Sequence, residues 1–260
     1  MDCVRQRIAT SENVEPVTST ACAAPRRTPS SAAAATSRPE ADGARFGAMT
    51  QLGNGLFYTD QHEDAFSVRD AELSMLRRLG AHEEHILAAQ GNLANSYQAL
   101  GRFDEALRAR KEVYSGHLKL HGEESRETLM AASNCANSLF GLKRFEEGRS
   151  LMRKTMPVMR RVLGESNEIT LKMRSLYGGA LYIDPGATLD DLREAVSTLE
   201  ETERIARRVF GGAHPLVRVT EDFLRKSRRA LSDREALLAK YLLYGASALA
   251  IAAFALVRRR

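Results

Sequence analysis

Amide side chains recur in regular pairs along the sequence, and they are the residues best suited to bind a ligand. The pairs are Gln51 and Asn54, Asn92 and Asn95, and Asn134 and Asn137. Within each pair the residues are three positions apart, so they are neighbours on the surface of a helix. An amide carries both donors and an acceptor. A row of amides can therefore hold the backbone of an extended peptide without requiring a particular sequence.

Two other interpretations of these polar residues remain open. Asn95 and Asn137 would also suit a structural role, in which they cap or bridge adjacent helices. Lys172 offers a positive charge for an acidic peptide, or it is simply a solvated residue of a helix.

Other arrangements that carry chemistry are weak or absent in the sequence. His82 and His85, and likewise His117 and His121, have spacings that would reach one metal ion, but no Cys or carboxylate pattern completes a site. No Gly-rich phosphate loop, nucleophile elbow or Cys/His pair is present. We therefore predict no metal, no cofactor and no catalytic residues, and we interpret Met130, Met152, Met156, Met159 and Met173 as core residues.

Composition points to a helical, interaction-type protein. The chain has 260 residues, of which 43% are hydrophobic and 6% aromatic, and Ala, Leu, Glu and Arg dominate. That mixture favours helices over strands. The net charge of +5 is spread along predicted helices beside acidic residues, which argues against a nucleic-acid partner. Cys3, Cys22 and Cys135 are too few and too far apart for a disulfide framework, which fits a reducing compartment.

An internal repeat organises the middle of the chain. Residues 129–170 match residues 87–128 at 13 of 42 positions, well above chance, including a shared N-x-x-A-N-S stretch. A third copy starts at Leu171 and carries an insert at IDPGAT, and a weaker copy precedes the first. About four helix pairs are therefore expected between residues 45 and 231.

Each copy is predicted to form a helix, a short turn and a second helix. The apolar residues expected to face the core are Leu93, Ala94 and Tyr97 on the first helix, and Phe103, Ala106, Val113 and Leu120 on the second. One such hairpin cannot bury its apolar stripe alone, so successive hairpins stack.

The repeated pattern resembles tetratricopeptide repeats. The stretch NLANSYQALGRFDEAL, with a glycine-containing turn every 42 residues and GAHP at Gly212–Pro215, is similar to the kinesin-light-chain subtype over about residues 46–220. The resemblance implies an all-α, right-handed superhelix of stacked antiparallel helix pairs. In peptide-binding members, asparagines at these two repeat positions line the concave groove. No heptad coiled coil precedes Phe46, so linkage to a motor is not implied.

The third and fourth helix pairs depart from the repeat pattern. Pro157 falls inside a predicted helix, where it removes one hydrogen bond and is expected to bend the helix. Gly148 stands where a small Ala is usual, and the IDPGAT insert lengthens a turn. These changes could shape a particular groove or reflect drift.

The two ends of the chain differ from the repeats. Residues 1–44 are rich in Ala, Ser, Thr and Pro and read as a disordered tail, with a transit peptide as the less favoured alternative. Residues 232–260 are predicted to form an apolar helix that opens with a capping box at Ser232 and Glu235. Its segment 237–257 is long enough to cross about 30 Å of hydrocarbon. The alternative is that this helix caps the array or docks on a partner.

These features together predict a non-enzymatic adaptor. Its groove would bind a protein or peptide, and Ala236–Val257 would tether it to the cytosolic face of an intracellular membrane. The alternatives are a soluble, cytoplasmic scaffold whose apolar tail caps the repeats or docks on a partner, and a regulatory part of a larger enzyme or signalling system.

Overall fold

The computed structural model describes the backbone of residues 37–257 and the side chains of residues 43–241. Residues 37–257 contain helices and turns but no β-strand, which confirms the all-α prediction. The chain divides into two compact units, residues 1–144 and residues 145–260. The first unit contains α2 (Ser37–Tyr58), α3 (His62–Arg78), α4 (Glu83–Ala99), α5 (Phe103–His121) and α6 (Arg126–Gly141). The second contains α7 (Phe145–Val162), α8 (Glu168–Ile183), α9 (Leu189–Phe210) and α10 (Pro215–Val257).

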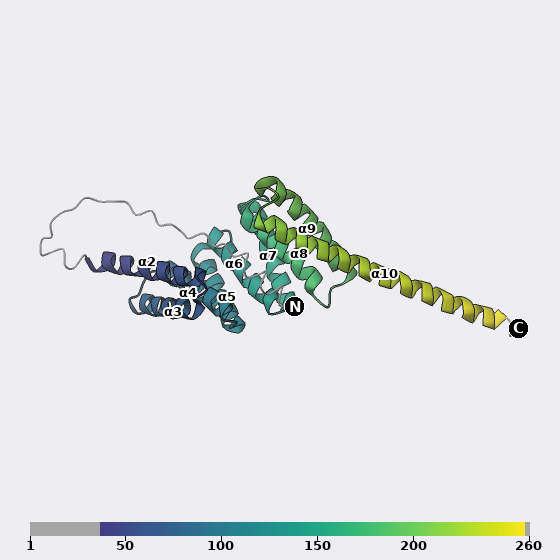
Figure 1. Cartoon of the computed structure of the whole chain (residues 1–260), viewed down its shortest axis with the longest axis horizontal. Helices are drawn as coiled ribbons and strands as arrows, with labels where there is room; N and C mark the ends of the chain where they lie inside the picture. The colour runs from purple at the N-terminus through teal and green to yellow at the C-terminus, as the bar shows by residue number, and fades with distance from the viewer. Residues whose placement is uncertain (1–36, 258–260) are drawn as a thin grey trace. The chain divides into compact units, whose positions relative to one another are not determined.

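Adjacent helices in each unit pack against each other, as expected of stacked helix pairs (Figure 1). Local signals place several boundaries. Ser125 caps α6 by accepting a hydrogen bond from the Thr128 amide, and Asn167 caps α8 in the same way. Gly122 follows α5 with a φ of 77°, a value that disfavours any side chain, so the repeated glycine ends the second helix.

The core of the first unit is built from the small and aliphatic residues that the repeat pattern predicts. Leu93, Ala94, Ala106 and Val113 are all buried. The prediction was wrong for Leu120, whose side chain is 46% exposed. Leu120 fits the helical period, but it lies in the last turn of α5, where the chain is about to leave the core.

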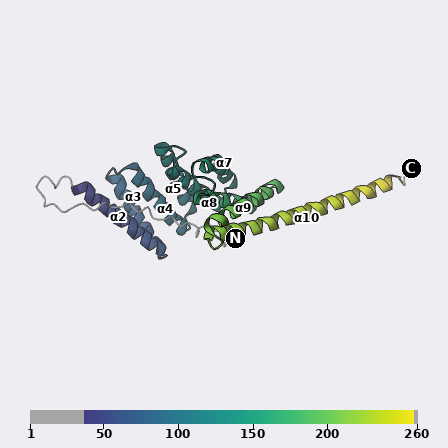
Figure 2. The same ribbon diagram turned by 90° about the horizontal axis from the view of Figure 1, so that it is seen from above.

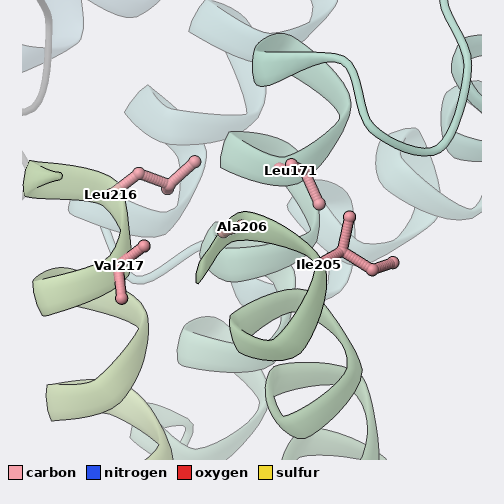
Figure 3. Packing of buried hydrophobic residues seen from close by; sticks show 5 residues of the cluster. All are labelled: Leu171, Ile205, Ala206, Leu216 and Val217. Atoms are coloured by element: carbon pink, nitrogen blue, oxygen red, sulfur yellow. The ribbon is translucent and has the colours of Figure 1, made fainter. Parts of the chain in front are cut away.

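The second unit is held together by contacts among its last three helices. Leu171 of α8, Ile205 and Ala206 of α9, and Leu216 and Val217 of α10 form one buried cluster (Figure 3). The glycine pair that follows in α8 allows a close approach. A Cβ added at Gly178 would lie 2.6 Å from Leu199 Cγ, and one at Gly179 would lie 2.9 Å from the Phe223 ring.

The N-terminal boundary lies earlier than the sequence predicts. Helix α2 begins at Ser37, so the last residues of the predicted tail 1–44 are helical. Pro39 is tolerated in a first helical turn, and the helix formers Glu40, Ala41 and Ala44 follow it. Residues 1–36 lie outside the described residues, and so do the proposed tail and transit peptide over that range.

The C-terminal helix also differs from the prediction. Helix α10 runs unbroken from Pro215 to Val257, so Ser232 and Glu235 lie inside it and do not open a new helix (Figure 2). No Gly or Pro interrupts residues 216–244, and the helix therefore continues. Within the described part of the chain, no helix combines the length and apolarity needed to cross a membrane. The predicted span at 237–257 is thus not supported, and its side chains from residue 242 onward lie outside the described ones.

Candidate functional site: an amide row in the first unit

The asparagine row is built around buried arginines of the second helices. Arg69 of α3 is 3% exposed. Its Nη2 donates to Asn54 Oδ1 of α2 at 2.9 Å, and its Nη1 donates to Ser96 Oγ at 2.8 Å and to the Asn92 carbonyl at 3.0 Å. Since Ser96 and Asn92 belong to α4, one guanidinium connects three helices. We call Asn54, Arg69 and Ser96 the first bridge.

The next helix pair repeats this arrangement. Arg110 of α5, also 3% exposed, donates from Nη2 to Asn95 Oδ1 at 2.9 Å. Its Nη1 donates to Ser138 Oγ at 2.8 Å and to the Asn134 carbonyl at 3.3 Å. We call Asn95, Arg110 and Ser138 the second bridge. Each bridge therefore binds one helix pair to the first helix of the next. Its hydrogen bonds involve a charged group and are stronger than those between neutral groups.

The two bridges share helix α4 and so form one continuous row. Ser96, the last member of the first bridge, directly follows Asn95, the first member of the second. Asn137 stands in the same place beside Ser138 on α6. The predicted series Asn54, Asn95 and Asn137 therefore follows α2, α4 and α6 in order.

The bridges also fix which way the amides face. A guanidinium has only donors, so the Oδ1 atoms of Asn54 and Asn95 must face Arg69 and Arg110. The Nδ2 groups of the two asparagines consequently point away from the arginines. Both side chains are half-buried and not enclosed. In each bridge the amide oxygen accepts the hydrogen bond, so the Nδ2 donors take no part in the bridge.

Burial and aromatic packing set the environment of the first bridge. Burial lowers the pKa of Arg69 from its ordinary value, while neighbouring Glu72 and Tyr58 oppose that shift. The guanidinium also lies 4.6 Å from the centre of the Phe57 ring. Burial raises the pKa of Glu72, against a hydrogen bond from Thr50 and the charge of Arg69. The bridge is a desolvated polar contact inside the repeat array.

The other predicted binding residues have different surroundings. Gln51 is exposed on α2, and the half-buried Asn92 and Asn134 contribute backbone carbonyls to the bridges. Lys172 belongs to α8 of the second unit and pairs with Glu168 at 2.8 Å, one turn away on the same helix.

The arginines and serines of the bridges were not predicted from the sequence. Arg69 and Arg110 each follow the asparagine of their own bridge by 15 residues, and Ser96 and Ser138 repeat at 42 residues. That spacing was a usable signal. A charged residue beside acidic neighbours on a helix is typical of a solvated face, so the sequence gives no direct indication that these arginines are buried.

The histidines of each pair lie close together, and three of the five methionines are core residues. The rings of His117 and His121 stack with centres 5.7 Å apart, and those of His82 and His85 lie 6.4 Å apart. In the described part of the chain, no three potential ligands gather to hold a metal ion. The interpretation of methionines as core residues is confirmed for Met152, Met159 and Met173, which are fully buried, whereas Met130 and Met156 are half-buried.

Comparison with known proteins agrees with the repeat pattern. A family model described as tetratricopeptide repeat matches residues 86–127 and 128–168. No curated protein matches the chain. The match begins within one residue of the repeat boundary that the sequence indicates, so the two units of repetition are the same.

Solved structures share the fold over most of the chain. One is a crystal structure of a point variant of the nearly identical TPR-like repeats of a putative kinesin light chain from Podosopora anserina. It is 20% identical, with a TM-score of 0.63, covering 78% of this chain and 93% of that one. The structure of the same repeats without the substitution is also 20% identical, with a TM-score of 0.62, covering 77% of this chain and 92% of that one. BtubC (BKLC) from P. vanneervenii is 16% identical, with a TM-score of 0.58 over 81% of this chain and 86% of that one.

Proposed function

We propose that this chain is a non-enzymatic adaptor that binds an extended peptide of a partner protein along the amide row. Its 42-residue repeats are tetratricopeptide repeats of the kinesin-light-chain type. The observation that carries the proposal is the repeated bridge. Asn54 and Asn95 are held in one orientation by Arg69 and Arg110, with their Nδ2 groups directed away from them.

Peptide binding by such a row follows from preorganisation. A side chain that is already held by a hydrogen bond loses little conformational entropy when it binds a ligand. The donors are spaced by the structural repeat and do not depend on the sequence of the ligand. They therefore suit the backbone carbonyls that every extended peptide carries. Selectivity then comes from the side chains that flank the row.

Replacing both asparagines with aspartate separates binding from stability. The Asn54→Asp, Asn95→Asp variant keeps an oxygen facing each arginine but loses both Nδ2 donors. We expect its thermal midpoint to stay at or above that of the wild type. Its affinity for peptides selected from a random display library should fall about tenfold or more, since each donor contributes about 0.5–1.5 kcal/mol.

Two further variants complete the test. Asn54→Ala, Asn95→Ala should lose both affinity and stability, because the arginines lose their acceptors. Asn167→Asp changes the same residue type outside the row, where an aspartate caps α8 equally well, and it should bind like the wild type. Unchanged peptide binding by the double aspartate variant would exclude the amide row from the function.

A second element of the proposal concerns α10, for which docking on a partner is favoured over capping of the repeats. Residues 232–241 are all exposed, and Leu237, Leu238 and Tyr241 lie among them. Tyr241 is 67% exposed. A cap would bury these side chains against the array, whereas a surface that meets a partner leaves them accessible in the isolated chain.

Serine substitutions test whether this part of α10 stabilises the array. Leu237→Ser with Leu238→Ser is expected to change the free energy of unfolding by less than about 0.5 kcal/mol, because exposed sites contribute little. The matched control Leu224→Ser removes a buried side chain of the same helix, and it should cost about 2–5 kcal/mol. Chemical denaturation measures both. An equal loss in the two variants would restore the capping role.

A further inference from the structure

Helix α2 exposes an uncharged face at the outer end of the first unit (Figure 2). Ala48, Leu52 and Gly55 follow one another at spacings of four and three residues, so they share one side of the helix. All three are exposed, and Leu52 is 55% exposed. A Cβ added at Gly55 would meet no atom of the described chain within 4 Å. We call these three residues the outer face of α2.

The same positions are buried in the next first helix. At the corresponding places of the following repeat, α4 has Ala89, Leu93 and Ser96, which are 3%, 4% and 0% exposed. Ala89 and Leu93 form one cluster with Leu73 and Leu76 of α3, the second helix of the preceding pair. The outer face of α2 is therefore the surface on which a preceding helix would pack, and no helix precedes α2 within residues 37–257.

The composition of α2 matches that of an internal helix. Between Arg45 and Asp60 the chain has no charged residue. The internal helices α4 and α6 have similar uncharged stretches, at residues 86–101 and 128–142. A terminal helix of a repeat array normally needs a polar outer face, and a contiguous exposed apolar surface marks an interaction site. The outer face of α2 thus indicates that another helix packs on it.

The residues around the outer face are arranged symmetrically about Leu52, which suits a second copy of the same helix. The small residues Ala48 and Gly55 lie four and three positions to either side of it. Arg45 and Asp60 lie seven and eight positions to either side and carry opposite charges. Both are exposed, and the Asp60 side chain is 95% exposed, with its carboxylate 3.6 Å from His62 Nε2. Antiparallel packing of two copies therefore brings small residues together on both sides of Leu52 and opposite charges together at both ends.

We propose that this chain forms a homodimer in which the outer faces of two α2 helices pack antiparallel about a two-fold axis at Leu52. The contact is isologous, so it closes after two copies and does not propagate. Each Ala48 lies near the partner's Gly55, which lets the two backbones approach closely, and each Arg45 lies near the partner's Asp60.

The dimer goes beyond the adaptor function, because its contact uses no residue of either bridge. It places two amide rows in one particle. A ligand with two binding segments would then bind with a higher apparent affinity than a ligand with one, since its second segment binds from a high effective concentration.

Sedimentation velocity of the full chain over a range of protein concentrations tests the proposal. We expect a monomer–dimer equilibrium, because a contact between two helices is at the small end of protein interfaces. Leu52→Glu should raise the dissociation constant of the dimer by about a hundredfold or more, since it places two like charges together on the two-fold axis. Its thermal midpoint, measured where both proteins are monomeric, should match that of the wild type, because Leu52 is exposed in the single chain.

Cysteine substitutions test the direction of packing. In a chain with Cys3→Ser and Cys22→Ser, Leu52→Cys should form a disulfide-linked dimer on mild oxidation. Ala48→Cys in the same background is the matched control, one turn away on the same face, and it should stay monomeric on a denaturing gel. Antiparallel packing separates its two copies by about 12 Å along the helix axes, whereas a disulfide joins Cα atoms that are no more than about 7 Å apart.

The exposed leucines of α10 provide a second control. Leu237→Glu with Leu238→Glu alters exposed apolar side chains outside the outer face, and this variant should dimerise like the wild type. The proposal is overturned if the full chain is monomeric at every concentration, which would leave the outer face to residues 1–36 or to another protein. It is also overturned if Leu52→Glu dimerises as tightly as the wild type, or if Ala48→Cys cross-links as readily as Leu52→Cys, which would indicate parallel packing.

Discussion

Replacing Arg110 with alanine is expected to lower the free energy of unfolding of the first unit by about 2–4 kcal/mol, because Ser138 and the Asn134 carbonyl each lose a partner where burial makes that costly. The guanidinium connects Asn95 of α4 to Ser138 of α6. Urea denaturation measures the total loss. Amide hydrogen exchange in α6 should show the largest local change, since α6 receives two of these three bonds.

The following repeat supplies the compensating substitution. One repeat later, the positions of Arg110 and Ser138 hold Met152 and Ala180, and both are buried. An Arg110→Met, Ser138→Ala variant replaces both polar partners with apolar groups, a change that is often neutral when packing is kept. We expect it to recover most of the stability lost in Arg110→Ala. If the double variant is as unstable as the alanine variant, the polar partners are not the cause of the loss.

Replacing Arg149 with leucine should destabilise the second unit by about 1–3 kcal/mol, because the half-buried Asp184 and Asp191 lose a charged hydrogen-bond partner. Arg149 of α7 is 7% exposed at its side chain and pairs with Asp184 at 2.6 Å and with Asp191 at 3.4 Å. Asp184 belongs to the IDPGAT insert between α8 and α9, and Asp191 lies in the first turn of α9. The preceding repeat has the buried Leu107 at this position and no such insert. The arginine therefore holds the longer turn in place.

The pH dependence provides a second measurement of the same contact. Hydrogen bonds from the Thr188 backbone and hydroxyl, followed by the charge of Arg149, hold the pKa of Asp191 below its ordinary value. A lowered carboxyl pKa contributes stability above the pKa of the unfolded chain, and that contribution is lost as the pH falls through the folded pKa. The Arg149→Leu variant should lose only the part due to the arginine. As a control, Glu146→Gln alters a partner that is 78% exposed, so it should cost less than about 1 kcal/mol.

Much of the fold could be predicted from the repeat. Small residues at Ala94 and Ala106 and the glycine that ends α5 are local signals, and each copy confirms the others. The helix boundaries that were predicted wrongly have competing local signals in the sequence. Ser232 and Glu235 satisfy a capping pattern, but α10 already packs against α8 and α9 before them and no Gly or Pro interrupts it there, so the helix continues.

The amide row was only partly visible in the sequence. Two chemically different roles, ligand contact and helix bridging, predict the same repeated asparagine. Only the packed structure shows that Asn95 Oδ1 meets Arg110, because that contact depends on how α4 and α5 lie against each other.

Helix α10 is continuous, so its C-terminal part and the part that packs against α8 and α9 belong to one helix. Its first part is fixed through Leu216, Val217 and Phe223, and Glu235 pairs with Arg193 of α9 at 3.2 Å. The remaining 22 residues extend about 33 Å further at 1.5 Å per residue. We expect a force on this segment to act first on the packing of Phe223 against Gly179, where an added Cβ would lie 2.9 Å from the ring.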